Sequence, residues 1–199
     1  MGFLCGLLGE RAERSRWTAK AVTFDPLSPF VRGIAGMSHY VTEDYDEAMR
    51  LYEEGLALDS NSVLCLWLSA IALERLGRFH EELERARRAV DLSRRSAMMV
   101  AIQSRALFRL GRVDEAHAIL EPLLSRASQD YAGEALWLFP ALLQGDDDAK
   151  ASALQRNIDA GTGPATLAVA LGVELRTLLT HPRLGPLVRQ LSLFAERDV

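Results

Sequence analysis

Amphipathic segments alternate with short polar turns along most of the chain. Within the segments, apolar residues recur three and four positions apart, which is the spacing of an α-helix with one buried face. The segments fall into pairs. We predict second helices over residues 45–58, 79–92, 113–125 and 147–157, each preceded by another helical segment of about fifteen residues.

The turn between the two helices of a pair recurs at a fixed interval. RLGRFHEEL and RLGRVDEAH share a glycine at the same place, and Gly77 and Gly111 lie 34 residues apart (111 − 77). The same step reaches Glu43 in TEDYDEAM and Gly145 in LLQGDDDAK, so the turn occurs four times. Glycine ends a helix because it adopts the left-handed conformation at little cost. The acids that follow favour the positive N-terminal end of the next helix.

A helix–turn–helix unit of this length resembles the tetratricopeptide repeat (TPR) family. The best copy is DYDEAMRLYEEGLALDSNS. Later copies depart from the family pattern: Glu82 replaces the usual alanine, Pro122 enters a helix, and Asp147 replaces an aromatic residue. The positions of the best copy that match the family's second helix are Tyr45, Ala48, Tyr52, Gly55 and Leu58.

The resemblance implies an all-α fold, a TPR-type right-handed superhelix (an α-α solenoid) of antiparallel helix pairs with a C-terminal capping helix. We expect residues 1–199 to form a single domain. Its expected parts are a truncated repeat at 1–28, repeats at 29–62, 63–96 and 97–130, a degenerate repeat at 131–160, and a cap and tail at 161–199.

When the interval of 34 residues is extended toward the N-terminus, the sequence is expected to begin inside a repeat. RAERSRWTAKAVTFDP corresponds to a second helix, which leaves only MGFLCGLLG for the first helix of that pair. The chain is then either a fragment of a longer protein or one whose apolar edge is open to an upstream domain or a second copy. The residues of this candidate oligomer edge are Phe3, Leu4, Leu7 and Leu8.

Two further stretches narrow the resemblance. DPLSPFV at 25–31 and HPRLGPLVRQL at 181–191 are similar to a bacterial subgroup in which TPR arrays form the C-terminal regulatory part of adenylate-cyclase-like or winged-helix regulator-like proteins. That subgroup's tail reads Asp-Pro-Arg-Phe, whereas His181 and Leu184 stand at its first and last positions here. The resemblance implies a bacterial regulatory domain whose partner domain lies outside this sequence.

Charge and composition exclude several classes of protein. A net charge of −4 gives no general attraction to nucleic acid. The longest apolar run is too short to cross a bilayer, so no membrane association is expected. Cys5 and Cys65 stand alone in apolar runs and are interpreted as core residues, which fits a cytoplasmic protein.

No candidate catalytic, cofactor or metal site emerges from the sequence. The four histidines are widely spread, and no pair has the spacing of a helical metal site. The aspartates of GDDDAK (145–150) are interpreted as helix N-terminal acids rather than metal ligands. We therefore expect neither an enzyme nor a cofactor.

A binding groove is the more promising prediction, because the first helices of TPR units line a concave surface. Arg75, Arg105 and Arg109 would either grip a carboxylate or phosphate, or lie as solvated stems over an apolar groove. Trp67 would be either a binding residue or a core residue. The predicted groove residues are Phe30, Met37, Tyr40, Trp67, Ile71, Arg75, Arg105, Phe108, Arg109 and Phe139.

These expectations favour a non-catalytic scaffold or regulatory module that presents its groove to a protein or peptide partner. One alternative is self-assembly, as a homodimer through the N-terminal edge. Another is a small-molecule-sensing regulatory domain of a bacterial signalling protein.

Overall fold

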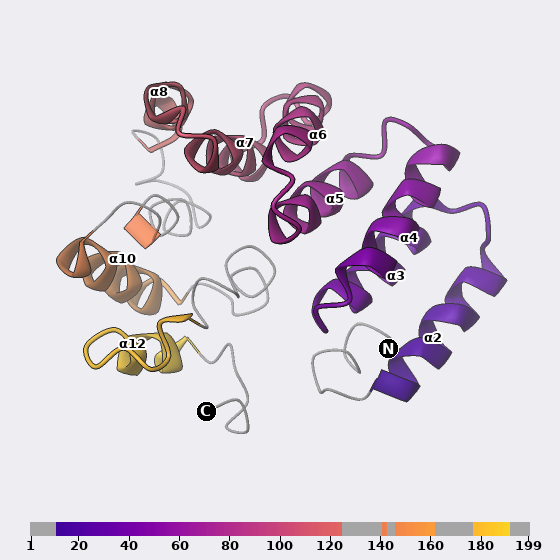
Figure 1. Cartoon of the computed structure of the whole chain (residues 1–199), viewed down its shortest axis with the longest axis horizontal. Helices are drawn as coiled ribbons and strands as arrows, with labels where there is room; N and C mark the ends of the chain where they lie inside the picture. The colour runs from indigo at the N-terminus through magenta and orange to yellow at the C-terminus, as the bar shows by residue number, and fades with distance from the viewer. Residues whose placement is uncertain (1–10, 125–140, 143–145, 162–176, 192–199) are drawn as a thin grey trace. The chain divides into compact units, whose positions relative to one another are not determined.

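The computed structural model describes residues 11–124, 141–142, 146–161 and 177–191 (Figure 1). Helices are the only regular elements in these residues, and no strand occurs among them. The predicted all-α class is therefore confirmed for this part of the chain. The chain divides into two compact units, Met1–Gly111 and Arg112–Val199. The expectation of a single domain over 1–199 stays a prediction.

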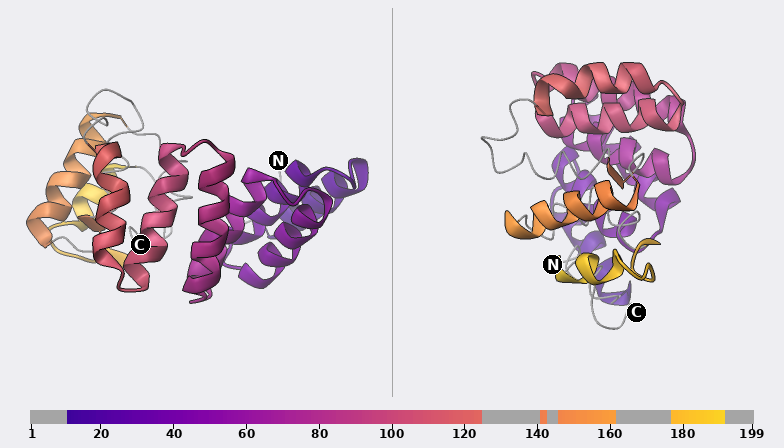
Figure 2. Two further views of the ribbon diagram at one scale, coloured as in Figure 1. Left: turned by 90° about the horizontal axis from the view of Figure 1, so that it is seen from above. Right: turned by 90° about the vertical axis from the view of Figure 1, so that its left-hand side faces the viewer.

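In the first unit, each helix packs against the next along the chain (Figures 1 and 2). In addition, α5 contacts both α3 and α7, so the first helices of successive pairs form a row. The helices are α2 (Arg11–Phe24), α3 (Pro29–Tyr40), α4 (Tyr45–Leu58), α5 (Val63–Arg75), α6 (Phe79–Leu92) and α7 (Ala97–Arg109).

The second unit contains α8 (Val113–Leu124), α10 (Asp147–Asp159) and α12 (Gly185–Gln190). The expected C-terminal helix corresponds to α12, which packs against α10 (Figure 2). Side-chain contacts join the start of α10 to the turn before α12: His181 Nε2 lies 3.3 Å from Asp147 Oδ2, and Arg183 Nη1 forms an ion pair with Asp148 Oδ1 at 2.6 Å.

The helix boundaries keep the repeat of the sequence. The predicted helices over 45–58 and 79–92 coincide with α4 and α6, and the starts of α8 and α10 are as predicted. Serine hydroxyls cap the first helices at the same step along the chain and accept hydrogen bonds from the backbone N–H three residues on. These serines are Ser28, Ser62 and Ser96.

The turns also repeat. Gly77 and Gly111 both have φ +72°, as the sequence predicted for glycines that end a helix. Glu43, at the equivalent place in the preceding turn, has φ +63°. The fourth turn, at Gly145, lies outside the described residues.

In the described ranges, no helix is long and apolar enough to cross a membrane.

Candidate interaction surface

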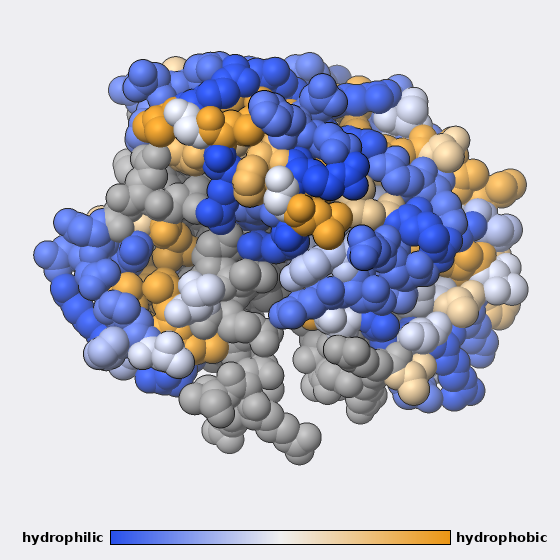
Figure 3. Space-filling model, viewed as in Figure 1, coloured by the Kyte–Doolittle hydropathy of each residue, from blue (hydrophilic) through white to orange (hydrophobic). Residues whose placement is uncertain are grey.

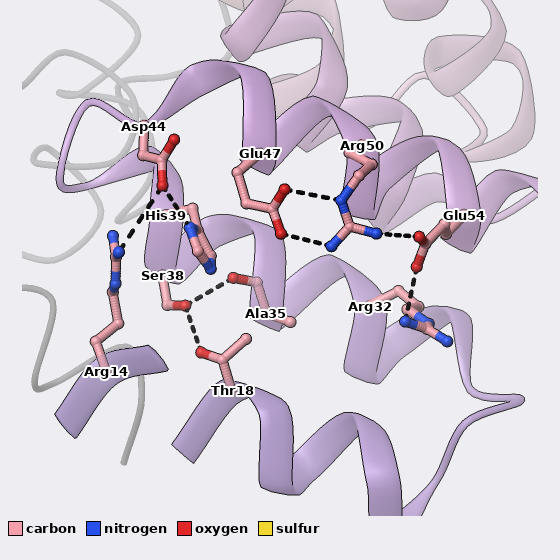
Figure 4. A network of polar contacts seen from close by, with 10 residues as sticks. All are labelled: Arg14, Thr18, Arg32, Ala35, Ser38, His39, Asp44, Glu47, Arg50 and Glu54. Carbon is pink, nitrogen blue, oxygen red and sulfur yellow. Dashed lines mark hydrogen bonds and ion pairs between the residues drawn. The ribbon is translucent and has the colours of Figure 1, made fainter. Parts of the chain in front are cut away.

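Helix α2 is fixed to the rest of the first unit at its N-terminal end (Figure 4). The buried Arg14 donates a hydrogen bond to Thr42 Oγ1, and its Nη2 lies 3.8 Å from Asp44 Oδ2. The same carboxylate oxygen is 2.8 Å from His39 Nδ1. Asp44 therefore connects α2, the end of α3 and the start of α4 at one point.

A second polar contact lies one turn further along α2. The Ser38 hydroxyl donates to the carbonyl oxygen of Ala35 at 2.6 Å, so the Thr18 hydroxyl donates to Ser38 Oγ at 2.9 Å. Both hydroxyl groups are buried and hydrogen-bonded, as buried polar groups need to be. These contacts join the N-terminal part of α2 to the C-terminal part of α3 (Figure 4).

Beyond Thr18 the two helices leave a cleft of about 430 Å³. Its walls are mainly apolar, and Thr18 and Ser38 lie in its lining at the hydrogen-bonded end. The apolar residues that line it are Trp17, Ala21, Phe24, Phe30, Val31, Ile34 and Ala35. This volume falls in the range of ligand-binding clefts in proteins.

Large apolar side chains stand in solvent beside the cleft. Phe24 is 80% exposed, Leu27 74% and Phe30 64%. Leu58, at the place in α4 that Phe24 has in α2, is 41% exposed. Hydrophobic side chains reach the surface toward the right of Figure 3, on the side where α2 and α3 lie in Figure 1. A cluster of this kind is typical of an interaction surface.

One basic residue, Lys20, lies among the residues that line the cleft. Lys20 is exposed, and its Nζ lies 5.3 Å from the centre of the Trp17 ring, within the range of a cation–π contact. The sequence of α2 contains Arg11, Arg14, Arg16 and Lys20 but only one acid, Glu13. This helix is therefore positive in a chain whose net charge is −4.

The adjoining pair of helices carries a chain of charged contacts (Figure 4). Arg50 donates to Glu47, with Nε 2.7 Å from Oε2, and this hydrogen bond lowers the pKa of the Glu47 carboxyl. Arg50 also contacts Glu54, whose Oε2 lies 2.7 Å from Arg32 Nη1. The last contact joins α3 to α4 across the surface of the unit.

Several predicted groove residues are less accessible than the sequence suggested. Ile71 is fully buried and Tyr40 is buried, with its hydroxyl accepting a hydrogen bond from Arg75 Nε at 3.2 Å. Neither side chain is available to a partner in this structure. Trp67, Met37 and Phe108 are half-buried, whereas Arg109 and Phe30 are exposed.

The predicted arginine cluster is not the solvent-facing spot that the sequence suggested. Arg105 is 1% exposed and forms an ion pair with Glu74, whose side chain is also buried. Arg109 Nε lies 3.0 Å from the other oxygen of Glu74. One buried carboxylate thus faces two guanidinium groups, and this arrangement joins α5 to α7.

The remaining predicted positions lie outside the described residues. They are Phe139 in the groove and Phe3, Leu4, Leu7 and Leu8 at the N-terminal edge.

The described histidines and acids form no group of three or more that could hold a metal ion. In GDDDAK, the Asp146 carboxylate caps α10 by accepting a hydrogen bond from the Ala149 N–H at 2.9 Å, which fits the interpretation of these acids as helix N-terminal residues.

The two cysteines were interpreted as core residues. Cys65 is buried, and this desolvation raises the pKa of its thiol, while Cys5 is not among the described residues.

A comparison with protein-family models finds no match for this chain, and a comparison with curated proteins finds none at a significant level.

Sequence reasoning missed most of the cleft. Trp17, Phe24 and Ile34 were assigned only to helices, because helical periodicity does not tell which apolar face lacks a neighbour. One signal was present: Phe24 and Leu27 flank the turn-forming dipeptide Asp25-Pro26, and side chains beside a surface loop are often exposed.

Proposed function

We propose that this chain is a non-catalytic protein-interaction module built from TPR-type helix pairs arranged as a right-handed superhelix. Three features support the repeat type: the equal spacing of the helices, the serine caps, and the left-handed turn residues. The row formed by α3, α5 and α7 is the arrangement that stacked helix pairs adopt.

The observation that carries the interaction function is the exposed cluster of Phe24, Leu27 and Phe30 around the α2–α3 cleft. Aromatic and aliphatic side chains lose most hydration when a partner covers them, and aromatic residues are common among those that dominate binding energy. The predicted groove remains a second candidate surface, through the half-buried Trp67 and Phe108.

The test is quantitative affinity capture with matched surface variants, followed by a titration with the purified captured protein. Phe24→Glu together with Phe30→Glu alters the cluster, and Trp67→Ala alters the groove. We expect the cluster variant to weaken binding at least tenfold while its circular dichroism stays that of the parent. A captured protein that binds parent and both variants equally would refute the proposal, as would the absence of any stoichiometric partner.

Self-association is a second candidate, since an exposed apolar cluster also suits a second copy of the chain. It predicts a mass by light scattering that rises with concentration in the parent and not in the cluster variant.

A further inference from the structure

We propose that the C-terminal end of α6 and its linker to α7 bind an acidic, partly apolar segment of another protein. The binding residues form the arginine surface, which consists of Arg87, Arg88, Arg94 and Arg95. This surface is separate from the apolar cluster around the α2–α3 cleft, so the inference goes beyond the proposed function. Three features carry it: arginines without acidic partners, a strained linker backbone and exposed apolar neighbours.

Positive charge is concentrated in one short stretch of the chain. Residues 85–95 contain five arginines and one acid, Asp91, although the net charge of the whole chain is −4. Arg85 is half-buried and pairs with Glu53, whose Oε1 lies 2.7 Å from Arg85 Nη2. The four other arginines of the stretch are exposed, and they form the arginine surface.

The arginine surface has no carboxylate partner in the described part of the chain. Elsewhere along the second helices, glutamates neutralise the arginines: the pairs are Arg50–Glu47, Arg78–Glu81 and Arg112–Glu115. By contrast, the side chains of Arg87, Arg94 and Arg95 form no hydrogen bond or ion pair with any described residue. Arg88 Nη2 donates to the neutral amide oxygen of Asn61 at 3.0 Å. These guanidinium groups therefore keep donors in the fork geometry that matches a carboxylate.

The linker that carries two of these arginines has a strained backbone. Arg94 has φ +54° and Arg95 has φ +61°, in the left-handed region that glycine and asparagine adopt more easily. At the equivalent place one repeat earlier, neither Ser60 nor Asn61 has a positive φ. The Arg95 N–H donates to the Val90 carbonyl oxygen at 2.8 Å, so the linker closes α6 through its backbone alone.

This strain points to a use of the two side chains outside the fold. A non-glycine residue in the left-handed region costs free energy, and such residues persist where a function needs them. No side-chain contact of Arg94 or Arg95 with the described residues offsets the cost. A carboxylate of a binding partner would provide the missing contact.

Two apolar side chains adjoin the arginines and define the partner further. Leu92 is 39% exposed and Met98 is 37% exposed. Leu92 lies one turn after Arg88 at the end of α6, and Met98 lies in the first turn of α7, directly after the linker. A partner segment that carries apolar residues between its acids gains from covering them.

The same residues argue against nucleic acid as the partner. Proteins that bind single strands stack bases on aromatic side chains, and residues 81–107 contain no aromatic residue. Asp91 lies within the stretch and would repel phosphate groups. The negative net charge gives no long-range attraction to a polyanion, whereas a segment with a few carboxylates needs only the local charge.

The test is a fluorescence anisotropy titration with a peptide in which pairs of glutamates are separated by single leucines. A peptide with glutamine in place of each glutamate and a single-stranded DNA are the comparison ligands. The linker variant carries Arg94→Gly and Arg95→Gly. The matched control variant carries Arg50→Gln and Arg78→Gln, which remove the same charge where glutamates already pair with the arginines.

We expect the glutamate peptide to bind the parent and the control variant with similar affinity. The linker variant should bind it about tenfold more weakly, as for the loss of two partly exposed ion pairs. Binding should weaken as salt is added, and the glutamine peptide should not bind. The linker variant should also have a higher urea midpoint than the parent, because glycine relieves the strained conformation.

Several results would overturn the proposal. They are no binding of the glutamate peptide to the parent, an equal loss in the linker and control variants, and tighter binding of the DNA than of the peptide. A lower urea midpoint of the linker variant would show that Arg94 and Arg95 serve the fold instead. A parent mass that rises with concentration, but not in the linker variant, would assign the surface to a second copy of the chain.

A further variant separates this proposal from the proposed function. Phe24→Ser with Phe30→Ser alters the apolar cluster and should leave binding of the glutamate peptide unchanged. If only this variant loses the peptide, the arginine surface is not the binding site and the apolar cluster is supported. If the captured partner is lost while peptide binding still depends on the linker arginines, the two surfaces act independently and both proposals stand.

Discussion

At the scale of single residues, the turns of the first unit show how one conformation is kept while the residue type changes. Gly77 and Gly111 adopt the left-handed region, and an added Cβ would meet no atom within 4 Å at either place. Glu43 adopts nearly the same conformation with a full side chain. The difference between these turns is therefore one of backbone conformational energy and not of packing.

Replacing Glu43 by glycine should stabilise the protein. We expect Glu43→Gly to raise the free energy of unfolding by about 0.5–1 kcal/mol, because the strained conformation is relieved and no packing is lost. Gly77→Ala and Gly111→Ala should each lower it by about 1 kcal/mol. Urea denaturation measures all three. A Glu43→Gly variant less stable than the parent would show that the Glu43 side chain has a stabilising contact.

At the scale of helices, the arginines of α7 act within the fold. Glu74 and Arg105 form an ion pair in which both side chains are almost fully buried. Buried charges need close counter-charges, since their removal from water is costly. The contact between α5 and α7 therefore depends on a polar pair as well as on apolar packing.

Removing the charge of Glu74 should be strongly destabilising. We expect Glu74→Gln to lower the free energy of unfolding by about 3 kcal/mol, because Arg105 then stays buried without this carboxylate. Arg109→Gln is the control. The side chain of Arg109 is 35% exposed, so the expected loss is below about 1 kcal/mol. Equal stability of Glu74→Gln and parent in thermal and urea unfolding would contradict this account.

At the scale of the whole molecule, ion pairs between arginine and glutamate recur along the second helices. Hydrogen bonds from Arg50 and Arg78 lower the pKa of Glu47 and Glu81, respectively. Arg112 and Glu115 form the same contact at 2.6 Å in the second unit. A carboxyl whose pKa is lowered by folding stabilises the folded state above its unfolded pKa and loses that effect as the pH falls.

Stability should therefore decline in acid. We expect the urea midpoint to fall as the pH drops below about 4, where these glutamates take up protons. Each pair is exposed, so the individual effects are small and should weaken further in high salt. Arg50→Gln with Arg78→Gln should reduce the decline between neutral pH and about pH 3. A decline of unchanged size in this variant would assign the acid sensitivity to other carboxyl groups.

The sequence by itself determined the local structure. The bounds of α4 and α6, the starts of α8 and α10, and the left-handed glycines at 77 and 111 were all predicted from spacing. These features depend on residues close in the chain, through helical periodicity and the steric freedom of glycine.

Only the tertiary structure decided which faces are covered. Sequence spacing placed Ile71, Arg105 and Phe30 together in one groove, yet Ile71 and Arg105 are buried while Phe30 stands in solvent beside the cleft. Whether a side chain is buried depends on the helices packed over it, and these are contributed by distant parts of the chain. For the same reason, the cleft between α2 and α3 is defined only by the tertiary structure.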